Sequence, residues 1–256
     1  MNKRIIPMLM LHSGQLYKSV QFSTNIYIGD PLIAVKIFNE KLAEELSIVD
    51  IDPCKYGSEI QFELLEQIAG ECFMPLSYGG GIKTVEDVRK ILYSGFEKVV
   101  LNSIVFKNQE VVRQMVDEFG SSTIVVSIDY KTINGMKQVF VDGGKTNTNI
   151  ELMDYLQTVK SLQVGEIILK AIDLDGTMSG MDLETIQKVS SAIQVPVIAN
   201  GGVGHLNDIS AGFSAGASAV GVSSLFVFKG PLKAVLINYP DPQVTKQVRN
   251  RSHVIV

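Results

Sequence analysis

The sequence predicts a single (β/α)8 barrel made of two duplicated half-barrels. Eight apolar, strand-like runs alternate with helix-length amphipathic segments along the 256 residues, and this repeated order is typical of a parallel sheet. A gapless internal repeat relates the two halves of the chain, as expected for an architecture of repeated units. The hydrophobic fraction of 46% allows a large core. An open doubly wound sheet is the structural alternative.

The strands are expected where short apolar runs follow polar or turn residues. Between two of these runs, TVEDVRKILYSG has apolar residues spaced by three and four, a capping Thr84 and a terminal Gly95, which predicts a helix. Eight strand-then-helix units in a chain of this length favour closure into a barrel. The expected strands are RIIPML, LSIVDI, MPLSYG, KVVLNS, TIVVSID, EIILKAI, VPVIANG and SAVGVSS.

The internal repeat is clearest between residues 74–103 and 195–224, which align without a gap at a shift of 121 residues. The same shift places Glu45 on Glu166. Agreement at many positions indicates duplication rather than chance. The matching pairs include Pro75 with Pro196, Gly80 with Gly201, Gly81 with Gly202, Asp87 with Asp208, Gly95 with Gly216 and Ser103 with Ser224.

The repeat also predicts the domain organisation. We expect one barrel domain over residues 1–240, with half-barrels at about 1–120 and 121–240. Residues 241–256 are expected to form a polar, weakly ordered C-terminal tail.

Two segments depart from the strand-then-helix rhythm. Residues 12–30 after the first strand are rich in β-formers and aromatic residues, which favour a hairpin or ribbon. Residues 130–149 after the fifth strand contain an Asn-Gly turn signal between strand-forming residues. Both are expected at the C-terminal face of the barrel, where barrel active sites are built. The alternative is that they are decorations without a function.

Composition excludes several classes of function. No apolar run is long enough to span a bilayer, and the N-terminus lacks the pattern of a signal peptide. With only Cys54, Cys72 and three His, neither a disulfide framework nor a metal site is expected, and a reducing cytoplasm fits best. The net charge of -4 gives no general attraction to nucleic acid or to anionic membranes. We expect no cofactor.

Two glycine-rich turns in equivalent positions predict phosphate binding. YGGG at 78–81 and NGG at 200–202 each follow a strand, and each has a companion one strand later, LNS at 101–103 and VSS at 222–224. Glycine lets backbone N–H groups approach an anion closely. Two such cradles on opposite sides of one mouth suggest a long ligand phosphorylated at both ends. The alternative is that the glycines only make tight turns.

Acidic residues at the strand ends are candidates for catalysis. Asp129 ends the fifth strand, where a carboxylate is well placed for general acid/base work, although it can also act as a cap. The position one half-barrel earlier lies near Met10, so only the second half carries this acid. Asp175 can accept hydrogen bonds from a substrate or cap a turn, and Gly176 can offer its amide to a phosphate. Asp50 is a possible assistant or a structural acid.

Four charged residues directly precede apolar strands, at the opposite end of the expected barrel. They are Arg4, Glu45, Lys98 and Glu166. Side chains at strand starts can point into the bottom of a barrel, where two cations and two carboxylates must pair because unpaired burial is costly. The alternative is four exposed charges at strand ends.

Together these motifs resemble the cyclase subunit of imidazole glycerol phosphate synthase over residues 2–240. The resemblance rests on KRIIP, GDP, GGGI, KVVLNS, FGS, SID, GEI, DLDGT and the GG at 201. It implies a (β/α)8 barrel paired with a glutaminase subunit, whose ammonia enters at the barrel bottom and travels through the interior. It also implies that the four strand-start charges are the family's ammonia gate.

The resemblance implies roles for further residues. Asp129 matches one of two catalytic aspartates, and Lys18 matches a lysine of the first loop. The positions that match the family's phosphate sites, for a phosphorylated small-molecule ligand, are Gly81, Asn102, Ser103, Asp175, Gly176, Gly202, Ser223 and Ser224.

The mouth departs from the family at several positions. The family motif Cys-Leu-Asp-Val at the first strand reads MLML here, so Met10 stands where the essential aspartate is expected. A thioether cannot exchange a proton usefully at neutral pH. Lys170 and Ala171 replace a common Thr-Ser pair, Leu174 replaces a basic residue and Val227 replaces a His. Met10 therefore indicates a vacated catalytic position.

Three functions remain open from the sequence. The favoured one is an ammonia-conducting subunit that pairs with a glutaminase, because FVFKGPLKAVLINYP resembles copies from bacterial surface-polysaccharide pathways that supply a sugar amidotransferase. The second is an active cyclase, a lyase of histidine biosynthesis. The third is a related phosphosugar isomerase, against which Met10 also counts.

Overall fold

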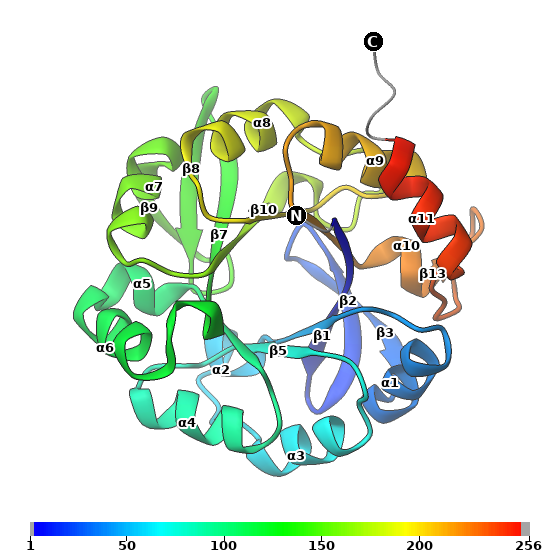
Figure 1. Cartoon of the computed structure of the whole chain (residues 1–256), viewed down its shortest axis with the longest axis horizontal. Helices are drawn as coiled ribbons and strands as arrows, with labels where there is room; N and C mark the ends of the chain where they lie inside the picture. The colour runs from blue at the N-terminus through cyan, green and yellow to red at the C-terminus, as the bar shows by residue number, and fades with distance from the viewer. Residues whose placement is uncertain (1–2, 252–256) are drawn as a thin grey trace.

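A closed eight-stranded parallel barrel forms the body of the protein. The computed structural model describes residues 3–251, with helices arranged around a central ring of strands (Figure 1). The barrel strands are ordered β10-β11-β12-β1-β4-β5-β6-β7, and β7 also pairs with β10 to close the sheet. This closure confirms the predicted (β/α)8 barrel and excludes the open doubly wound sheet.

All eight predicted strands are present. The barrel strands are β1 Arg4–His12, β4 Leu46–Asp50, β5 Leu76–Gly79, β6 Lys98–Leu101, β7 Ile124–Ile133, β10 Glu166–Ala171, β11 Val197–Asn200 and β12 Ala219–Val222. The helices are α1 Pro31–Glu40, α2 Asp52–Lys55, α3 Phe62–Gly70, α4 Val85–Tyr93, α5 Ser103–Lys107, α6 Gln109–Phe119, α7 Leu152–Ser161, α8 Leu183–Ala192, α9 Leu206–Ser214, α10 Ser224–Val227 and α11 Pro242–Arg251. There are also short 3-10 turns, η1 Ser121–Thr123 and η2 Ile172–Leu174, and a small hairpin, β13 Phe228–Lys229 and β14 Ala234–Val235.

The hydrogen-bond register follows the internal repeat. Leu46 lies opposite Leu76 in the β4–β5 pair, and Ile167 lies opposite Val197 in the β10–β11 pair, 121 residues later. Equal registers give the two halves the same alternation of inward and outward side chains. Equivalent residues therefore occupy equivalent places inside the barrel.

Met10 and Asp129 occupy one such equivalent pair of places. Met10 lies opposite Val49 in the β1–β4 pair, and Asp129 lies opposite Lys170 in the β7–β10 pair. Val49 and Lys170 are themselves related by the shift of 121 residues. The second half thus has a carboxylate at this position, Asp129, whereas the first half has the thioether of Met10.

The barrel has an outer and an inner apolar core. The outer core packs the helices against the outward side chains of the strands, as with Ile5 and Leu9 of β1. The inner core fills the middle of the barrel, and its buried members are Ile6, Met8, Val100, Val125, Ile168, Ile198 and Ala219. A barrel interior of this kind is packed with side chains rather than open as a wide pore.

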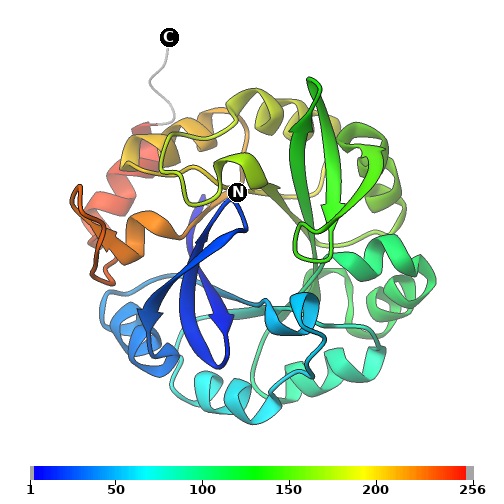
Figure 2. The ribbon, with the colours of Figure 1, turned by 180° about the vertical axis from the view of Figure 1, so that it is seen from behind.

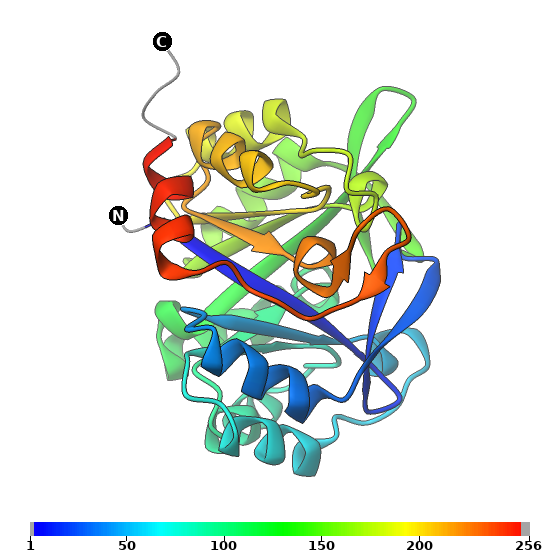
Figure 3. The ribbon, with the colours of Figure 1, turned by 90° about the vertical axis from the view of Figure 1, so that its right-hand side faces the viewer.

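Two antiparallel ribbons extend the sheet at one end of the barrel (Figures 2 and 3). β2 Gln15–Val20 and β3 Thr24–Gly29 extend β1, while β8 Met136–Val141 and β9 Thr146–Glu151 extend β7. The predicted ribbons are confirmed. Pairing with β2 extends β1 to His12, and pairing with β8 extends β7 to Ile133. Asp129 therefore lies within β7, and the prediction that it ends the strand is wrong.

The weak order expected after Pro240 is wrong for residues 242–251, which form helix α11. Its Thr245 and Val248 are buried, and the Val248 carbonyl accepts a hydrogen bond of 2.9 Å from Ser210 of α9. Arg249 also pairs with Glu44 at 2.6 Å. Only a few residues of this polar segment are buried, a signal too sparse for sequence periodicity to detect. Residues 252–256 of the expected tail lie outside the described residues.

Other expectations concern membranes, metals and cysteines. Within residues 3–251, no helix has the length and hydropathy needed to cross a bilayer. No group of three or more His, Cys, Asp or Glu side chains in this part of the chain is arranged to hold a metal ion. Cys72 is a free thiol, and the side chain of Cys54 lies outside the described part.

Docking of α11 can be tested with Val248→Ala. The change should lower the free energy of unfolding by roughly 1–2 kcal/mol, because each buried methylene contributes about 0.8 kcal/mol and a cavity remains. Urea denaturation of the full chain measures this difference. Lys246→Ala, exposed on the same helix, is the matched control and should change stability by less than about 0.5 kcal/mol. Equal effects of the two changes would contradict docking.

Candidate functional site

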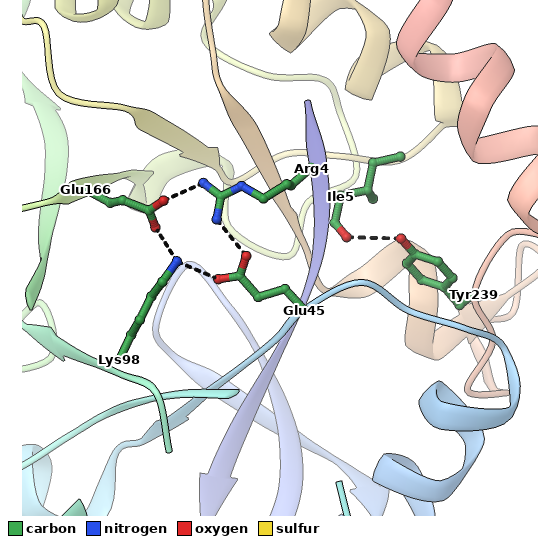
Figure 4. A network of polar contacts seen from close by, with 6 residues as sticks. All are labelled: Arg4, Ile5, Glu45, Lys98, Glu166 and Tyr239. Carbon is green, nitrogen blue, oxygen red and sulfur yellow. Dashed lines mark hydrogen bonds and ion pairs between the residues drawn. The ribbon is translucent and has the colours of Figure 1, made fainter. Parts of the chain in front are cut away.

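Four charged side chains form a closed ring at the N-terminal end of the barrel (Figure 4). Arg4 lies 2.6 Å from a carboxylate oxygen of Glu45 and 2.6 Å from one of Glu166. Lys98 lies 3.5 Å from Glu45 and 3.1 Å from Glu166. Burial opposes the positive charge of Arg4, but the two carboxylates outweigh it and raise the pKa of Arg4. All four predicted residues therefore meet, and each cation bridges both acids.

A cavity of about 540 Å³ opens at the other end of the barrel, where the ribbons lie. This volume is within the usual range for small-molecule sites. Its lining contains Asp129 and Met10 from equivalent strands. It also includes other residues singled out from the sequence, which are Lys18, Asp50, Gly80, Gly81, Asn102, Ser103, Lys170 and Ser223.

The first predicted phosphate cradle lines this cavity. Gly81 has φ of +69°, and a Cβ there would lie 2.3 Å from the Cβ of Pro53. The turn therefore requires glycine for both its conformation and its close packing. Next to it, Asn102 donates to the Ser127 carbonyl at 3.0 Å, and the Ser103 hydroxyl accepts the backbone N–H of Asp142 at 2.9 Å.

The second predicted cradle lines the cavity only in part, through Asn200 and Ser223, whereas Gly202, Gly176, Asp175 and Ser224 are not part of the cavity lining. The Gly202 carbonyl accepts the N–H of Gly180 at 2.8 Å, so the loop before α8 covers this turn. The Ser224 hydroxyl is buried and has no hydrogen-bond partner among the described residues. Buried polar groups are normally paired, so this unpartnered hydroxyl is an exception among the described residues.

Of the equivalent residues Met10 and Asp129, only Asp129 has a side chain that can exchange a proton. Its carboxylate accepts a 2.8 Å hydrogen bond from the Ser127 hydroxyl. Burial raises the pKa of Asp129, while Lys170 and this hydrogen bond partly oppose the rise. Met10 lines the same cavity without a polar group that can titrate.

The β2–β3 ribbon is tied across the mouth by a buried ion pair. Lys18 of the ribbon lies 2.8 Å from Asp175, and Lys170 lies 3.9 Å from the same carboxylate. Burial alone would raise the pKa of Asp175, but the two lysines lower it. Phe22 of the ribbon stacks on Lys170, with the ammonium 4.9 Å from the ring centroid. The ribbon therefore forms one wall of the site.

Several lining residues were not selected from the sequence, among them Phe22, Asn200 and Asp142. Asn200 belongs to the quoted NGG motif, so its position at a strand end was an available signal. Phe22 and Asp142 lie in the segments predicted as ribbons, but nothing in the sequence shows which ribbon side chains turn toward the mouth.

Near the mouth, His12 and Asp52 form a close pair outside the cavity lining. The His12 Nδ1 atom lies 2.5 Å from a carboxylate oxygen of Asp52, and its ring stacks on Tyr56. The N–H of Asp52 donates to Asp50 at 2.9 Å. Burial raises the pKa of Asp50 to about 6, although this hydrogen bond opposes the rise.

A family model described as "Histidine biosynthesis protein" matches residues 4–232. The chain belongs to this family. It is 43% identical over 253 residues to a Vibrio vulnificus protein provisionally named imidazole glycerol phosphate synthase subunit hisF3, covering 96% of each chain. A Leptospira borgpetersenii protein provisionally named subunit HisF is 44% identical over 241 residues, covering 93% of this chain and 95% of its own.

A third relative extends this pattern. The Pseudomonas aeruginosa protein provisionally named imidazole glycerol phosphate synthase subunit hisF2 is 42% identical over 241 residues, covering 93% of this chain and 96% of its own. The resemblance identified from the motifs is therefore confirmed at the level of the family and of homology to proteins named for the HisF cyclase subunit.

Asp50→Asn should remove a pH dependence of stability. Because the pKa of Asp50 is about 6 in the folded protein, the folded state keeps a proton that the unfolded chain has already released. The stabilisation that protonated Asp50 gives to the folded state is complete below about pH 4 and is lost as the pH rises through about 6. Between pH 4.5 and 7.5, the variant should gain roughly 2 kcal/mol of stability relative to wild type.

Urea denaturation at both pH values measures this gain. The exposed carboxylate of Asp154 supplies the matched control, since Asp154→Asn should leave the pH profile parallel to that of wild type. A parallel profile for Asp50→Asn would show that Asp50 does not hold this proton.

Proposed function

We propose that this protein is an ammonia-conducting subunit that pairs with a separate glutaminase and has an impaired cyclase site. The observation that carries the proposal is the closed ring of Arg4, Glu45, Lys98 and Glu166 at the N-terminal end of an apolar barrel interior. Homology to proteins named for imidazole glycerol phosphate synthase supports it. In this proposal the ring is the gate through which ammonia enters.

The interior beyond the ring suits neutral ammonia. Apolar side chains of the inner core, such as Ile6, Val125 and Ile168, lie between the ring and the mouth. A charged ammonium ion would lose its hydration there at a high cost, whereas uncharged ammonia would lose much less.

The N-terminal face carries three exposed, large apolar side chains, which we name together the N-terminal patch. Leu42, Phe73 and Tyr93 are 67%, 88% and 84% exposed. They lie in or next to the connections that lead into three neighbouring barrel strands, β4, β5 and β6. Large exposed aromatic residues are typical anchors of protein interfaces. We assign this patch to the glutaminase partner.

Replacement of an acid by Met10 is the basis for an impaired cyclase. With Asp129 alone, the mouth has one of the two carboxylates that the family chemistry uses, and Lys170 lies opposite it in the β7–β10 pair. A cytoplasmic sugar amidotransferase of a surface-polysaccharide pathway is our proposed ammonia acceptor. The C-terminal segment that resembles this branch supports that assignment.

An active cyclase, making imidazole glycerol phosphate, is the second candidate. Two observations favour it: Asp129 is retained, and the first cradle lines the cavity with Gly81, Asn102 and Ser103. The unpartnered hydroxyl of Ser224 favours a second phosphate site. In either function, we propose that the eight matched phosphate positions bind a phosphorylated ligand and that no metal or cofactor takes part.

Partner docking can be tested with Phe73→Asp and Tyr93→Asp. Each change should weaken the complex with the cognate glutaminase at least about tenfold, because a charge would replace a buried anchor. Analytical ultracentrifugation and titration calorimetry with the full chain measure the dissociation constant.

Leu232→Asp is the matched control for docking. Leu232 is 93% exposed and lies in the β13–β14 turn, which follows the C-terminal end of β12. This change should leave the glutaminase affinity unaltered. Two species that do not interact at micromolar concentration, or equal losses for all three changes, would refute docking at the N-terminal face.

Cyclase impairment can be tested with Met10→Asp. Loss of one general acid or base should cost about 100-fold to 10,000-fold, so wild type should turn over the histidine-pathway nucleotide very slowly with ammonium chloride. The variant should recover part of this rate because Asp129 is present. Recovery is expected to be partial, since Lys170 has also changed the pocket. Single-turnover loss of the nucleotide measures both rates.

Met10→Leu is the control for this measurement, because it keeps an apolar side chain of similar volume. It should leave the slow wild-type rate unchanged. Wild-type turnover as fast as that of an ordinary cyclase would show that Met10 is not a catalytic vacancy and would favour the second candidate.

A further inference from the structure

An inserted segment interrupts the internal repeat in the outer layer of the barrel. In the first half, α6 follows α5 after Asn108 alone and packs on α4. In the second half, residues 228–241 separate α10 from α11, and α11 packs on α9, which is equivalent to α4. Residues 228–241, which we name the inserted segment, therefore have no counterpart in the first half, where the outer layer is complete without them.

Both ends of the inserted segment are anchored. Phe228 is buried and pairs with Val235 in the β13–β14 hairpin. The Tyr239 hydroxyl is buried and donates to the Ile5 carbonyl at 3.1 Å (Figure 4). The Tyr239 ring meets Phe226 of α10 edge-on, with the ring centroids 5.2 Å apart. The hairpin and the stretch that follows it are thus held in place against β1 and α10.

The middle of the inserted segment exposes apolar side chains instead of burying them. All of residues 231–236 are exposed. Leu232, at the tip of the hairpin, is 93% exposed, and Val235 and Leu236 are 45% and 48% exposed. A single exposed leucine is ordinary, but a run of exposed apolar residues on an anchored hairpin is typical of an interaction surface.

A recess of about 350 Å³ lies in the outer layer next to this hairpin. Its apolar walls include Leu206 of α9, Leu225 of α10 and Val244 of α11, and its polar lining residues are Lys41, Asn238 and Asp241. In Figure 3 the stretch after the hairpin crosses the face toward the viewer and leads to α11, so the hairpin and the recess share one face. A recess of this size can admit a leucine side chain.

The occupant that fits both features is a second copy of this chain. Because one face carries both a protruding apolar tip and an apolar recess, two copies related by a two-fold axis can each insert the tip into the recess of the other. The charges agree with this arrangement, since Lys229 and Lys233 are exposed beside the tip and Asp241 borders the recess. Lys41 also borders the recess, so Asp241 is the expected partner of Lys233 across the interface.

We propose that the chain forms a symmetric dimer in which Leu232 of each copy enters the recess of the other. Burial of two tips and two recesses drives the association, and the ion pairs at the rim fix its orientation. The hairpin projects from the side of the barrel (Figure 2), and no residue of the inserted segment lines the mouth cavity. The dimer is therefore independent of ammonia conduction and goes beyond the proposed function.

Analytical ultracentrifugation of the full chain tests the dimer. Wild type should sediment with twice the mass of one chain at micromolar concentration. Leu232→Asp should raise the dimer dissociation constant at least about 100-fold, because a central anchor is lost from both copies. Val244→Trp should do the same, because the larger side chain fills the recess. Circular dichroism checks that each variant is folded.

A mixture of the two variants separates insertion of the tip from a general loss of stability. Leu232→Asp keeps its recess and Val244→Trp keeps its tip, so a mixed pair retains one of the two insertions, whereas either variant alone has none. The mixture should therefore associate at least about tenfold more tightly than either variant alone. Met136→Asp is the matched control, since Met136 is 51% exposed beside the turn of the β7–β8 hairpin, and it should leave the dimer intact.

Several outcomes would overturn the dimer. Wild type that stays monomeric up to about 0.1 mM would refute it, including the case in which the tip binds a different protein. A dimer that persists in both folded variants, or that Met136→Asp also dissociates, would place the interface elsewhere. Two folded, monomeric variants that fail to associate when mixed would show that the tip does not enter the recess.

Discussion

Pairing of β7 with β10 is the constraint on which the rest of the structure depends. This pairing closes the sheet, and closure means that alternate residues of each strand must point into one shared interior. Along β10 the inward positions are Glu166, Ile168 and Lys170, which reach the ring, the inner core and the cavity in turn. A shift of one residue would send all three charged or core side chains to the wrong side.

Cations and carboxylates lie at both ends of this interior, but the arrangements differ. At the N-terminal end each cation bridges both acids, so the four charges compensate one another in a closed ring. At the mouth the cations Lys18 and Lys170 both approach Asp175, while Asp129 stays apart with a hydroxyl partner and a raised pKa. The ring is self-contained, whereas the mouth retains unsatisfied groups for a ligand.

Duplication explains how these differences arose within one framework. The two halves keep the same register, yet the equivalent positions Met10 and Asp129, or Val49 and Lys170, differ completely in polarity. The backbone tolerates either kind of side chain because the cavity is lined by both. A barrel of this type can therefore change the chemistry of its mouth while its ring and its glycine turns remain intact.

Much of the protein was determined by the sequence alone. Eight apolar strand-like runs alternating with helix-length segments, together with the 121-residue repeat, predicted the closed barrel, and strand-start charges predicted the residues of the ring. These features are local or repeated, so the chain itself carries them. Tertiary structure decided which charges are partners, that α11 docks through Thr245 and Val248, and that Gly202 lies outside the cavity. Ser224 was left without a hydrogen-bond partner among the described residues in the same way, because the partners of a side chain depend on which strands close around it.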